Sequence, residues 1–255
     1  DASADQLRAL ADIARRFVQD TLRTTVEQNI LFRWVSEADL PEFYQAIKAI
    51  GLGAADAATI VDVTACPGTD TCKLGIASSR GLARELRYRL GEKSLELDAA
   101  VKNLRIKVSG CFNSCGQHHI ADIGFYGINR NVKGFQVPHF QVVLGGKFHD
   151  NAGEYGVPIG AVPSKRIPEA VLSITEYYVR RREKNERFQE FVARIGKKAI
   201  KDLLEDLTKI PAPEVDRSYY TDWGDPREFT LADMGVGECA GEVVSQAEFA
   251  LAASE

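Results

Sequence analysis

The sequence predicts an α+β fold, in which a small helix–strand–helix unit precedes a larger α/β unit. Hydrophobic residues recur with a helical period in some segments and with a strand period in others. The 255 residues, 45% of them hydrophobic, are enough for one large domain or two small ones. Because Pro211-Ala-Pro marks a boundary, we expect units at residues 1–58 and 59–210, followed by a C-terminal extension or linker at 211–255.

The first unit is predicted from two helix patterns and one strand pattern. Residues 5–19 repeat apolar side chains on one helical face. Residues 22–35, rich in Thr and Val, are interpreted as one strand. A second helix is expected to be capped by Asp39 and to end at Gly51. With a further strand at residues 60–63, this order is typical of part of a split βαβ unit and not of a self-contained domain.

The larger unit is predicted to combine strands with amphipathic helices. Residues 105–109 alternate apolar and polar side chains, which predicts a half-buried strand. A glycine pair stops the strand that ends at Leu144, and Pro168 opens the next helix. We predict a helix, three strands and two helices, in that order, at residues 73–90, 105–109, 120–126, 139–144, 169–187 and 188–207.

Charge and hydropathy argue against two classes of partner. The formal net charge of -4 gives no global basic field, so nucleic acid is not expected as a partner. No apolar run approaches the roughly 20 residues needed to cross a bilayer, so no membrane association is expected. The sequence shows no secretory leader pattern. We therefore expect a cytoplasmic protein, whose thiols in a reducing compartment are available to metal.

Four of the five cysteines form two close pairs, Cys66/Cys72 and Cys111/Cys115. Five cysteines in 255 residues are too few for a disulfide scaffold, so the paired ones are interpreted as ligands. Structural zinc sites usually pair their ligands two to four residues apart. An iron–sulfur cluster takes four thiolates at wider and more varied spacing, which suits these pairs.

Local sequence around the cysteines supports an anionic cluster. Cys72 is expected to directly precede a helix capped by Thr71, which would place backbone N–H groups and the positive end of the helix dipole at the cluster. Cys111 follows a predicted strand, where sites collect in α/β sheets. Gly110 and Gly116 flank the second pair and leave space for something bulky to approach the backbone.

Three other readings of the four cysteines stay open at this stage. They could be buried thiols without metal, ligands of a structural zinc ion, or a redox-active dithiol. The last lacks the C-x-x-C pattern. Spacing and flanking glycines favour the cluster over each of them.

Several ordered motifs resemble the sirohaem-dependent sulfite and nitrite reductases. They are Cys66-x5-Cys72, Cys111-Phe-Asn-Ser-Cys115-Gly, Arg23-Thr-Thr-Val-Glu-Gln28-Asn29 and Val143-Leu-Gly-Gly146. The resemblance spans about residues 5 to 205. It implies a ferredoxin-like half-domain followed by an α/β domain that binds a 4Fe–4S cluster and sirohaem.

The resemblance also implies roles for individual residues. The four paired cysteines would bind the cluster, and Cys115 would bridge it to the sirohaem iron. Gln28 and Asn29 would lie at the haem edge. From its place between the paired cysteines, and not from the resemblance, Asn113 is a candidate to donate to sulfur or to a haem carboxylate, with a plain turn-former as the alternative. The reaction implied is the six-electron reduction of sulfite to sulfide, or of nitrite to ammonia. The connection between the cysteine pairs resembles the sulfite branch more. Electrons would come from a donor such as ferredoxin or a flavoprotein.

The resemblance covers only the second of two related halves of such enzymes. The cations that grip substrate are expected in the first half, so no catalytic residue is assigned here and the chain alone is expected to be inactive. Six basic residues are substrate candidates by type only, and each is interpreted as solvated surface charge: Arg23, Lys73, Arg80, Arg130, Lys133 and Lys147.

The remaining thiol and two histidines are given no ligand role. His118 and His119 follow the second cysteine pair, but Cys115 already takes the axial place in the family scheme. Cys239 has no neighbouring cysteine and is interpreted as a free thiol on the tail. The alternatives to a reductase are an iron–sulfur electron-transfer module without haem and a zinc-stabilised structural domain.

Overall fold

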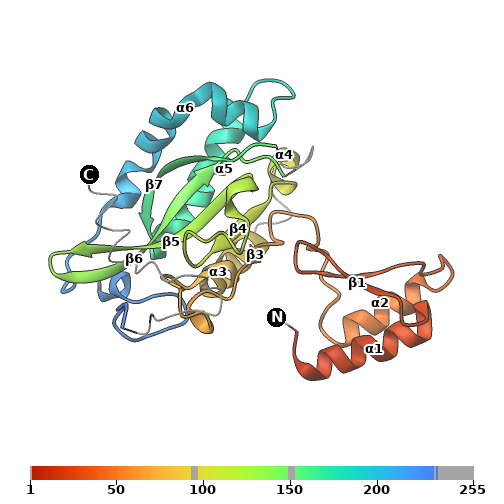
Figure 1. The fold of residues 1–255 in the computed structure, drawn as a ribbon. Coiled ribbons are helices and arrows are strands. Elements are labelled where there is room, and N and C mark those ends of the chain that lie inside the picture. Colours follow the sequence, from red (N-terminus) through yellow and green to blue (C-terminus); the bar gives the residue numbers. More distant parts are fainter. Residues whose placement is uncertain (1, 93–96, 149–152, 233, 235–255) are drawn as a thin grey trace.

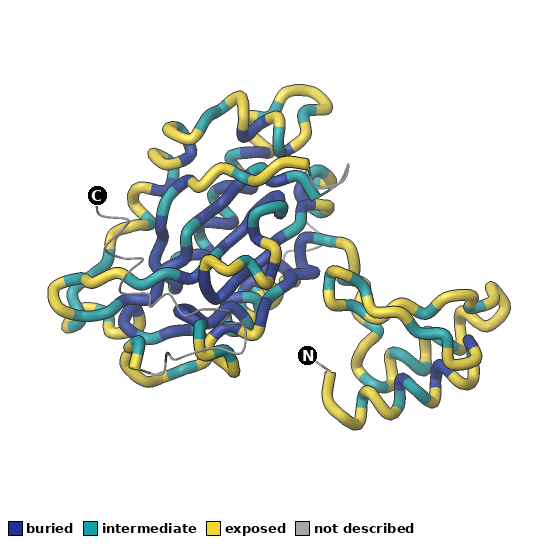
Figure 2. The backbone as a smooth tube through the Cα atoms, viewed as in Figure 1, coloured by how far each residue is buried: buried dark blue, intermediate teal, exposed yellow. Residues whose placement is uncertain are grey.

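The computed structural model describes residues 2–92, 97–148, 153–232 and 234 of the chain. Within these ranges the protein is mixed α+β, as predicted, with a small N-terminal unit and a larger unit built on a five-stranded sheet (Figure 1). Buried residues concentrate in that sheet, whereas the N-terminal unit is mostly exposed (Figure 2). None of the helices in the described ranges is long and apolar enough to cross a lipid bilayer.

The N-terminal unit packs two helices against a two-stranded hairpin. A capping box of Ser3 and Gln6 starts the first helix. Phe43 joins the elements, with its ring centroid 5.6 Å from that of Phe17 and 4.9 Å from that of Phe32. The elements are α1 (Ala4–Val18), β1 (Leu22–Thr24), β2 (Ile30–Phe32) and α2 (Leu40–Ala49).

The single strand predicted at residues 22–35 is wrong, because the chain turns back within it. β1 and β2 pair antiparallel, with Thr24 opposite Ile30. The N–H of Gln28 donates to the carbonyl of Thr25 at 3.1 Å, and Gln28 has a φ of 65°. Thr- and Val-rich composition indicated strand but not the left-handed residue that reverses it.

The second helix lies where it was predicted, but its expected cap is wrong. The Asp39 side chain makes no capping hydrogen bond to the start of α2. The helix ends before Gly51, whose φ of 76° suits a residue without a Cβ.

The larger unit is a sheet with strand order β3-β4-β5-β6-β7 and helices packed against it. β3, β4 and β5 run parallel, and β5, β6 and β7 run antiparallel. α3 packs beside β3 and β4, α6 beside β7, and α5 contacts both of these helices. The elements are β3 (Thr64–Ala65), α3 (Ser79–Glu92), α4 (Ala99–Lys102), β4 (Ile106–Ser109), β5 (Ile123–Val132), β6 (Phe135–Leu144), β7 (Val157–Pro163), α5 (Ile167–Arg181) and α6 (Phe188–Leu204).

Several predicted elements have different bounds in the structure. The strand expected at residues 60–63 is displaced to β3, because residues 59–63 form turns. The helix expected from residue 73 starts six residues later, where Ser78 Oγ accepts a hydrogen bond from the Gly81 N–H. α5 ends at Arg181, before the expected residue 187.

Two strands differ from expectation because of their place in the sheet. All four residues of β4 are buried, and not half of them as predicted, because β4 lies between two parallel neighbours. β7 was not predicted, since Pro158, Gly160 and Pro163 suggest a loop. It is an edge strand, where proline is tolerated.

Residues 211–232, called here the C-terminal segment, pack on the larger unit. Tyr219 and Tyr220 are buried against Val137 of β6, and Tyr220 donates to the carbonyl of Pro211 at 2.9 Å. Asp222 is also buried. The boundaries at residues 58 and 210 stay predictions.

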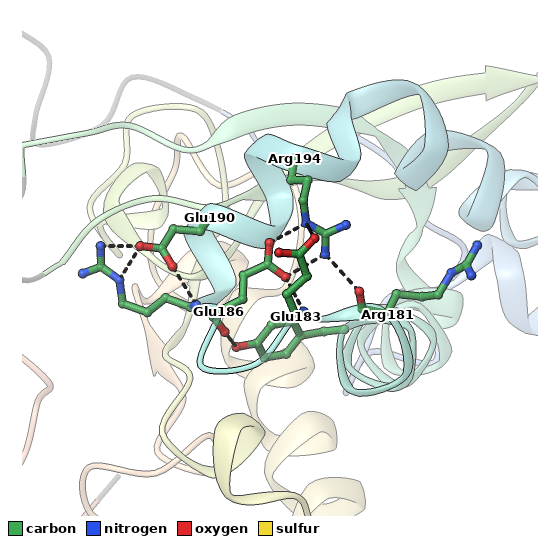
Figure 3. A network of polar contacts seen from close by, with 7 residues as sticks. Arg181, Glu183, Glu186, Glu190 and Arg194 are labelled. Carbon is green, nitrogen blue, oxygen red and sulfur yellow. Dashed lines mark hydrogen bonds and ion pairs between the residues drawn. The ribbon is translucent and has the colours of Figure 1, made fainter.

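A polar network holds the turn between α5 and α6 (Figure 3). Arg194 donates to both carboxylate oxygens of Glu186, at 2.6 and 2.7 Å, and to the carbonyl of Arg181 at 2.9 Å. Tyr178 donates to the carbonyl of Glu186 at 2.7 Å. The hydrogen bonds from Arg194, helped by the N–H of Glu183, lower the pKa of Glu186 to about 2.

Replacing Glu186 with Gln should lower the melting temperature at neutral pH. The native carboxylate keeps its charge until the pH falls toward about 2, whereas in the unfolded chain it takes up a proton near pH ~4.3. The stabilisation is therefore present above the unfolded value and is lost as the pH falls through the folded one. Circular dichroism melts should show the difference between the two proteins shrinking over that range.

The matched control is Glu176→Gln, at an exposed position of α5. Its melting temperature should follow that of the unsubstituted protein at every pH. A difference for Glu186→Gln that stays constant down to the acid limit would contradict the assigned ion pair.

Candidate functional site

The two cysteine pairs start at neighbouring strand ends. Cys66 directly follows β3, and Cys111 follows β4 after one glycine. β3 and β4 are parallel, with Ala65 opposite Val108, so both chains leave the sheet at the same edge. This edge is where sites in α/β sheets collect. The first cysteine loop is defined here as residues 66–78 and the second as residues 110–116.

The two cysteine loops are joined by hydrogen bonds at Gly110. The Gly110 N–H donates to the sulfur of Cys66 at 3.1 Å. Its carbonyl accepts from the N–H groups of Ile76 and Ala77 at 2.9 and 3.0 Å. A donor directed at a cysteine sulfur orients that sulfur and supports it as a ligand.

The glycines beside the cysteines make room for backbone. A Cβ at Gly110 would lie 2.6 Å from the Cα of Gly68, and one at Gly116 would lie 2.3 Å from the Val108 carbonyl oxygen. We predicted that these glycines leave space for a bulky group. Instead they let Gly110 approach the first cysteine loop and Gly116 approach β4.

The positive end of the α3 dipole lies near a different cysteine from the one predicted. Cys72 does not precede α3; it follows a short 3-10 turn (Gly68–Asp70), of which Thr71 is the C-cap, so the expected helix cap is wrong. α3 begins at Ser79, whose Oγ lies 3.5 Å from the sulfur of Cys66 and donates to the Cys66 carbonyl at 2.7 Å. The positive end of α3 therefore lies near Cys66.

The four sulfur atoms lie within electrostatic reach of one another. The pKa of Cys111 is raised to about 11, mainly by burial; the Asn113 N–H opposes the rise, and the charges of Cys66, Cys115 and Cys72 add to it. Cys66 and Cys111 are 8% and 7% exposed, Cys72 is half-buried and Cys115 is exposed. Four thiolates gathered in this way repel each other, so the arrangement is suited to a cationic inorganic core.

A single metal ion and a 4Fe–4S cluster place different demands on a donor set. Within the part of the chain that the structure describes, no three His, Cys, Asp or Glu side chains are grouped so as to hold a metal ion. A tetrahedral zinc site gathers its ligands around one ion. A 4Fe–4S cluster takes four thiolates on separate irons and accepts a wider arrangement.

The two amides predicted at the haem edge form hydrogen bonds to residues that precede the first cysteine loop. Gln28 donates to the carbonyl of Ala65 at 2.8 Å and accepts from its N–H at 3.2 Å. Asn29 donates to the carboxylate of Asp62 at 2.7 Å. The hairpin of the N-terminal unit is thus attached directly before Cys66.

The other candidate residues lie in varied surroundings. Asn113 is exposed. Arg80 is 3.6 Å from Asp70 and, like Lys147, is partly buried. Cys239 lies outside the described residues. The remaining basic candidates are exposed, as surface charge would be: Arg23, Lys73, Arg130 and Lys133.

Two buried polar residues near the second cysteine loop were not given a role from sequence. Lys107 of β4 is 1% exposed and donates to Gln117 at 3.1 Å; burial lowers its pKa. His118 is fully buried, with Nδ1 2.9 Å from Ser109 Oγ and no described partner for Nε2. Burial lowers the pKa of His118 to about 3, so its ring is neutral. The sequence could have pointed to Lys107, because it is a lysine within an apolar strand.

Known sequence families match almost the whole described chain. The family described as "Nitrite and sulphite reductase 4Fe-4S domain" matches residues 56–211, and "Nitrite/Sulfite reductase ferredoxin-like half domain" matches residues 1–50. The chain belongs to the nitrite and sulfite reductase family. This confirms the predicted family, the ferredoxin-like half-domain, and the 4Fe–4S cluster and sirohaem as its cofactors.

Individual relatives of this chain include proteins named for either substrate. It is 31% identical over 195 residues to "Sulfite reductase [ferredoxin]" of Mycobacterium tuberculosis, covering 74% of this chain and 34% of the relative. It is 28% identical over 214 residues to "Assimilatory ferredoxin-dependent nitrite reductase" of Haloferax mediterranei, covering 83% and 36%. The solved structure of the Mycobacterium tuberculosis NirA protein aligns with a TM-score of 0.65 and 29% identity, covering 76% of this chain and 36% of that one. The chain spans about a third of the length of these curated relatives.

Replacing Gly110 with Ala should separate the two cysteine loops. The added Cβ would meet the Gly68 Cα at 2.6 Å and the Ala77 carbonyl at 2.9 Å, both of them backbone atoms. We expect the free energy of unfolding to fall by about 1–3 kcal/mol, measured by urea denaturation of the protein without its cofactors. The control is Gly160→Ala in β7, where a Cβ meets nothing within 4 Å. Equal stability of the two variants would refute the close approach.

Proposed function

We propose that this chain is the cluster-bearing half of a reductase that converts sulfite to sulfide with six electrons, with nitrite to ammonia as the alternative substrate. One observation carries the proposal: two cysteine pairs leave adjacent parallel strands at the same edge, and the Gly110 N–H reaches the sulfur of Cys66 at 3.1 Å. Relatives are named for both substrates. The connection between the cysteine pairs favours sulfite.

In this proposal Cys66, Cys72, Cys111 and Cys115 hold the cluster, and together with sirohaem it supplies single electrons to substrate at the haem iron. The buried sulfurs of Cys66 and Cys111 form the inner part of the site. N–H groups of Gly110 and Asn113 point at these two sulfurs and stabilise their charge. Cys115 is exposed, as a bridge to a second cofactor requires.

The polar residues around the cysteines position the haem-binding side. Gln28 and Asn29 fix the hairpin turn against the residues that precede Cys66, which supports their place at the haem edge. Asn113, exposed between Cys111 and Cys115, is available to a haem carboxylate or to sulfur.

The whole protein is proposed to need further partners. Sulfite or nitrite is the substrate, and a donor such as ferredoxin or a flavoprotein supplies electrons; two relatives carry ferredoxin in their names. The related first half of the enzyme would supply the cations that bind substrate. We therefore expect the isolated chain to be inactive. A cytoplasmic location would keep the thiols reduced for iron.

Cysteine substitutions in the whole protein test the proposal. Cys66→Ser should remove the cluster, seen as loss of iron, acid-labile sulfide and the broad absorption near ~400 nm, because it deletes one of only four thiolate ligands. Cys115→Ser should uncouple or expel the haem, seen as loss of magnetic coupling or of the Soret band. Cys239→Ser is the control and should leave iron and sulfide unchanged.

Three results would each contradict one part of the proposal. Retention of full iron and sulfide by Cys66→Ser would remove the cluster assignment. Retained coupling between haem and cluster in Cys115→Ser would refute the bridge. A whole protein that holds the cluster but shows no Soret band would be an electron-transfer module instead.

A further inference from the structure

The C-terminal segment extends past the end of the family match at residue 211 and returns to the first cysteine loop. Figure 1 shows it in blue, beside the orange start of α3. The contact is made by Asp222, which is only 7% exposed. A buried carboxylate needs hydrogen-bond donors to offset the loss of water.

Asp222 accepts hydrogen bonds from three parts of the chain. Its carboxylate receives the Ser78 N–H at 2.7 Å, the Ser164 hydroxyl at 2.9 Å and the Trp223 N–H at 2.8 Å. Lys165 adds a bond to the Asp222 carbonyl at 3.0 Å and lies 4.3 Å from the centre of the Trp223 ring. The carboxylate therefore joins the last residue of the first cysteine loop to the turn between β7 and α5.

The bond to Ser78 acts one residue away from a cysteine contact. Ser78 caps α3, and the next residue, Ser79, lies 3.5 Å from the sulfur of Cys66 through its Oγ. Backbone contact reinforces the junction, since a Cβ at Gly81 would lie 2.4 Å from the Trp223 carbonyl oxygen. The position of Ser78 therefore sets where the Ser79 hydroxyl stands against Cys66.

Elsewhere the segment stands away from the first cysteine loop. A cavity of about 570 Å³ separates them, with Cys72 and Lys73 on the loop side and Asp225 and Arg227 on the segment side. The junction at Ser78 and Gly81 lies at the wall of this cavity.

We propose that Asp222 is a positioning residue for the first cysteine loop, holding the start of α3 so that Ser79 and Cys66 stand correctly for the cluster. The proposal rests on the proposed function in one respect, that Cys66 binds iron. Its structural part, control of the exposure of Cys66 by Asp222, does not depend on iron.

The test compares Asp222→Asn with Asp225→Asn in the whole protein. Asn keeps the size of Asp222 but turns an N–H₂ group toward donors, so at least one of its hydrogen bonds is lost. Asp225 is in the same segment and lines the same cavity, but its hydrogen bonds go to Arg227. Two rates are measured: iron loss to a chelator from the loaded protein, and alkylation of Cys66 relative to Cys111 in the iron-free protein, by peptide mass spectrometry.

We expect both rates to rise about tenfold in Asp222→Asn and to stay unchanged in Asp225→Asn, the factor for losing one hydrogen bond to a charged group. Equal rates in the two variants would overturn the proposal. So would a parallel rise at Cys66 and Cys111 with a lower melting temperature, since that indicates general destabilisation. If the unsubstituted protein binds no iron but Asp222→Asn still exposes Cys66 selectively, the positioning role is supported and the proposed function fails.

Discussion

The parallel pairing of β3 with β4 is the constraint on which the site depends. It brings Cys66 and Cys111, 45 residues apart in the numbering, to the same edge of the sheet. An antiparallel pair would have sent the two loops to opposite ends. Once both loops start together, the N–H of Gly110 can reach the sulfur of Cys66 and the start of α3 can lie beside it.

The close approach of the two cysteine loops has an electrostatic consequence. Burial disfavours the charged form of a thiol, as the raised pKa of Cys111 shows. At Cys111 the N–H of Asn113 offsets this only in part, while the N–H of Gly110 is directed at the sulfur of Cys66. The site therefore brings together four thiolate charges that repel one another. A positive inorganic core would offset this repulsion, which is the chemical reason a cluster fits the site.

The first cysteine loop is held by residues from both ends of the chain. Gln28, from the N-terminal hairpin, bonds the backbone of Ala65 at its start. Asp222, from the C-terminal segment, bonds Ser78 at its end. The N-terminal unit has little core of its own, so this contact also ties it to the larger unit. Peripheral parts of the chain thus contribute to the geometry at Cys66.

Sequence alone determined the features that are local in the chain: the paired cysteines, the family motifs, and helices such as α1 whose periodicity spans several turns. Only the tertiary structure decided that residues 22–35 form a hairpin, that β7 is a strand, and that α3 starts at Ser79 beside Cys66. Those outcomes depend on partners distant in sequence, such as the strand that β7 pairs with or the carboxylate of Asp222 that reaches Ser78. Local propensity carries no information about such partners, because hydrogen bonds and burial are settled only when the chain is folded.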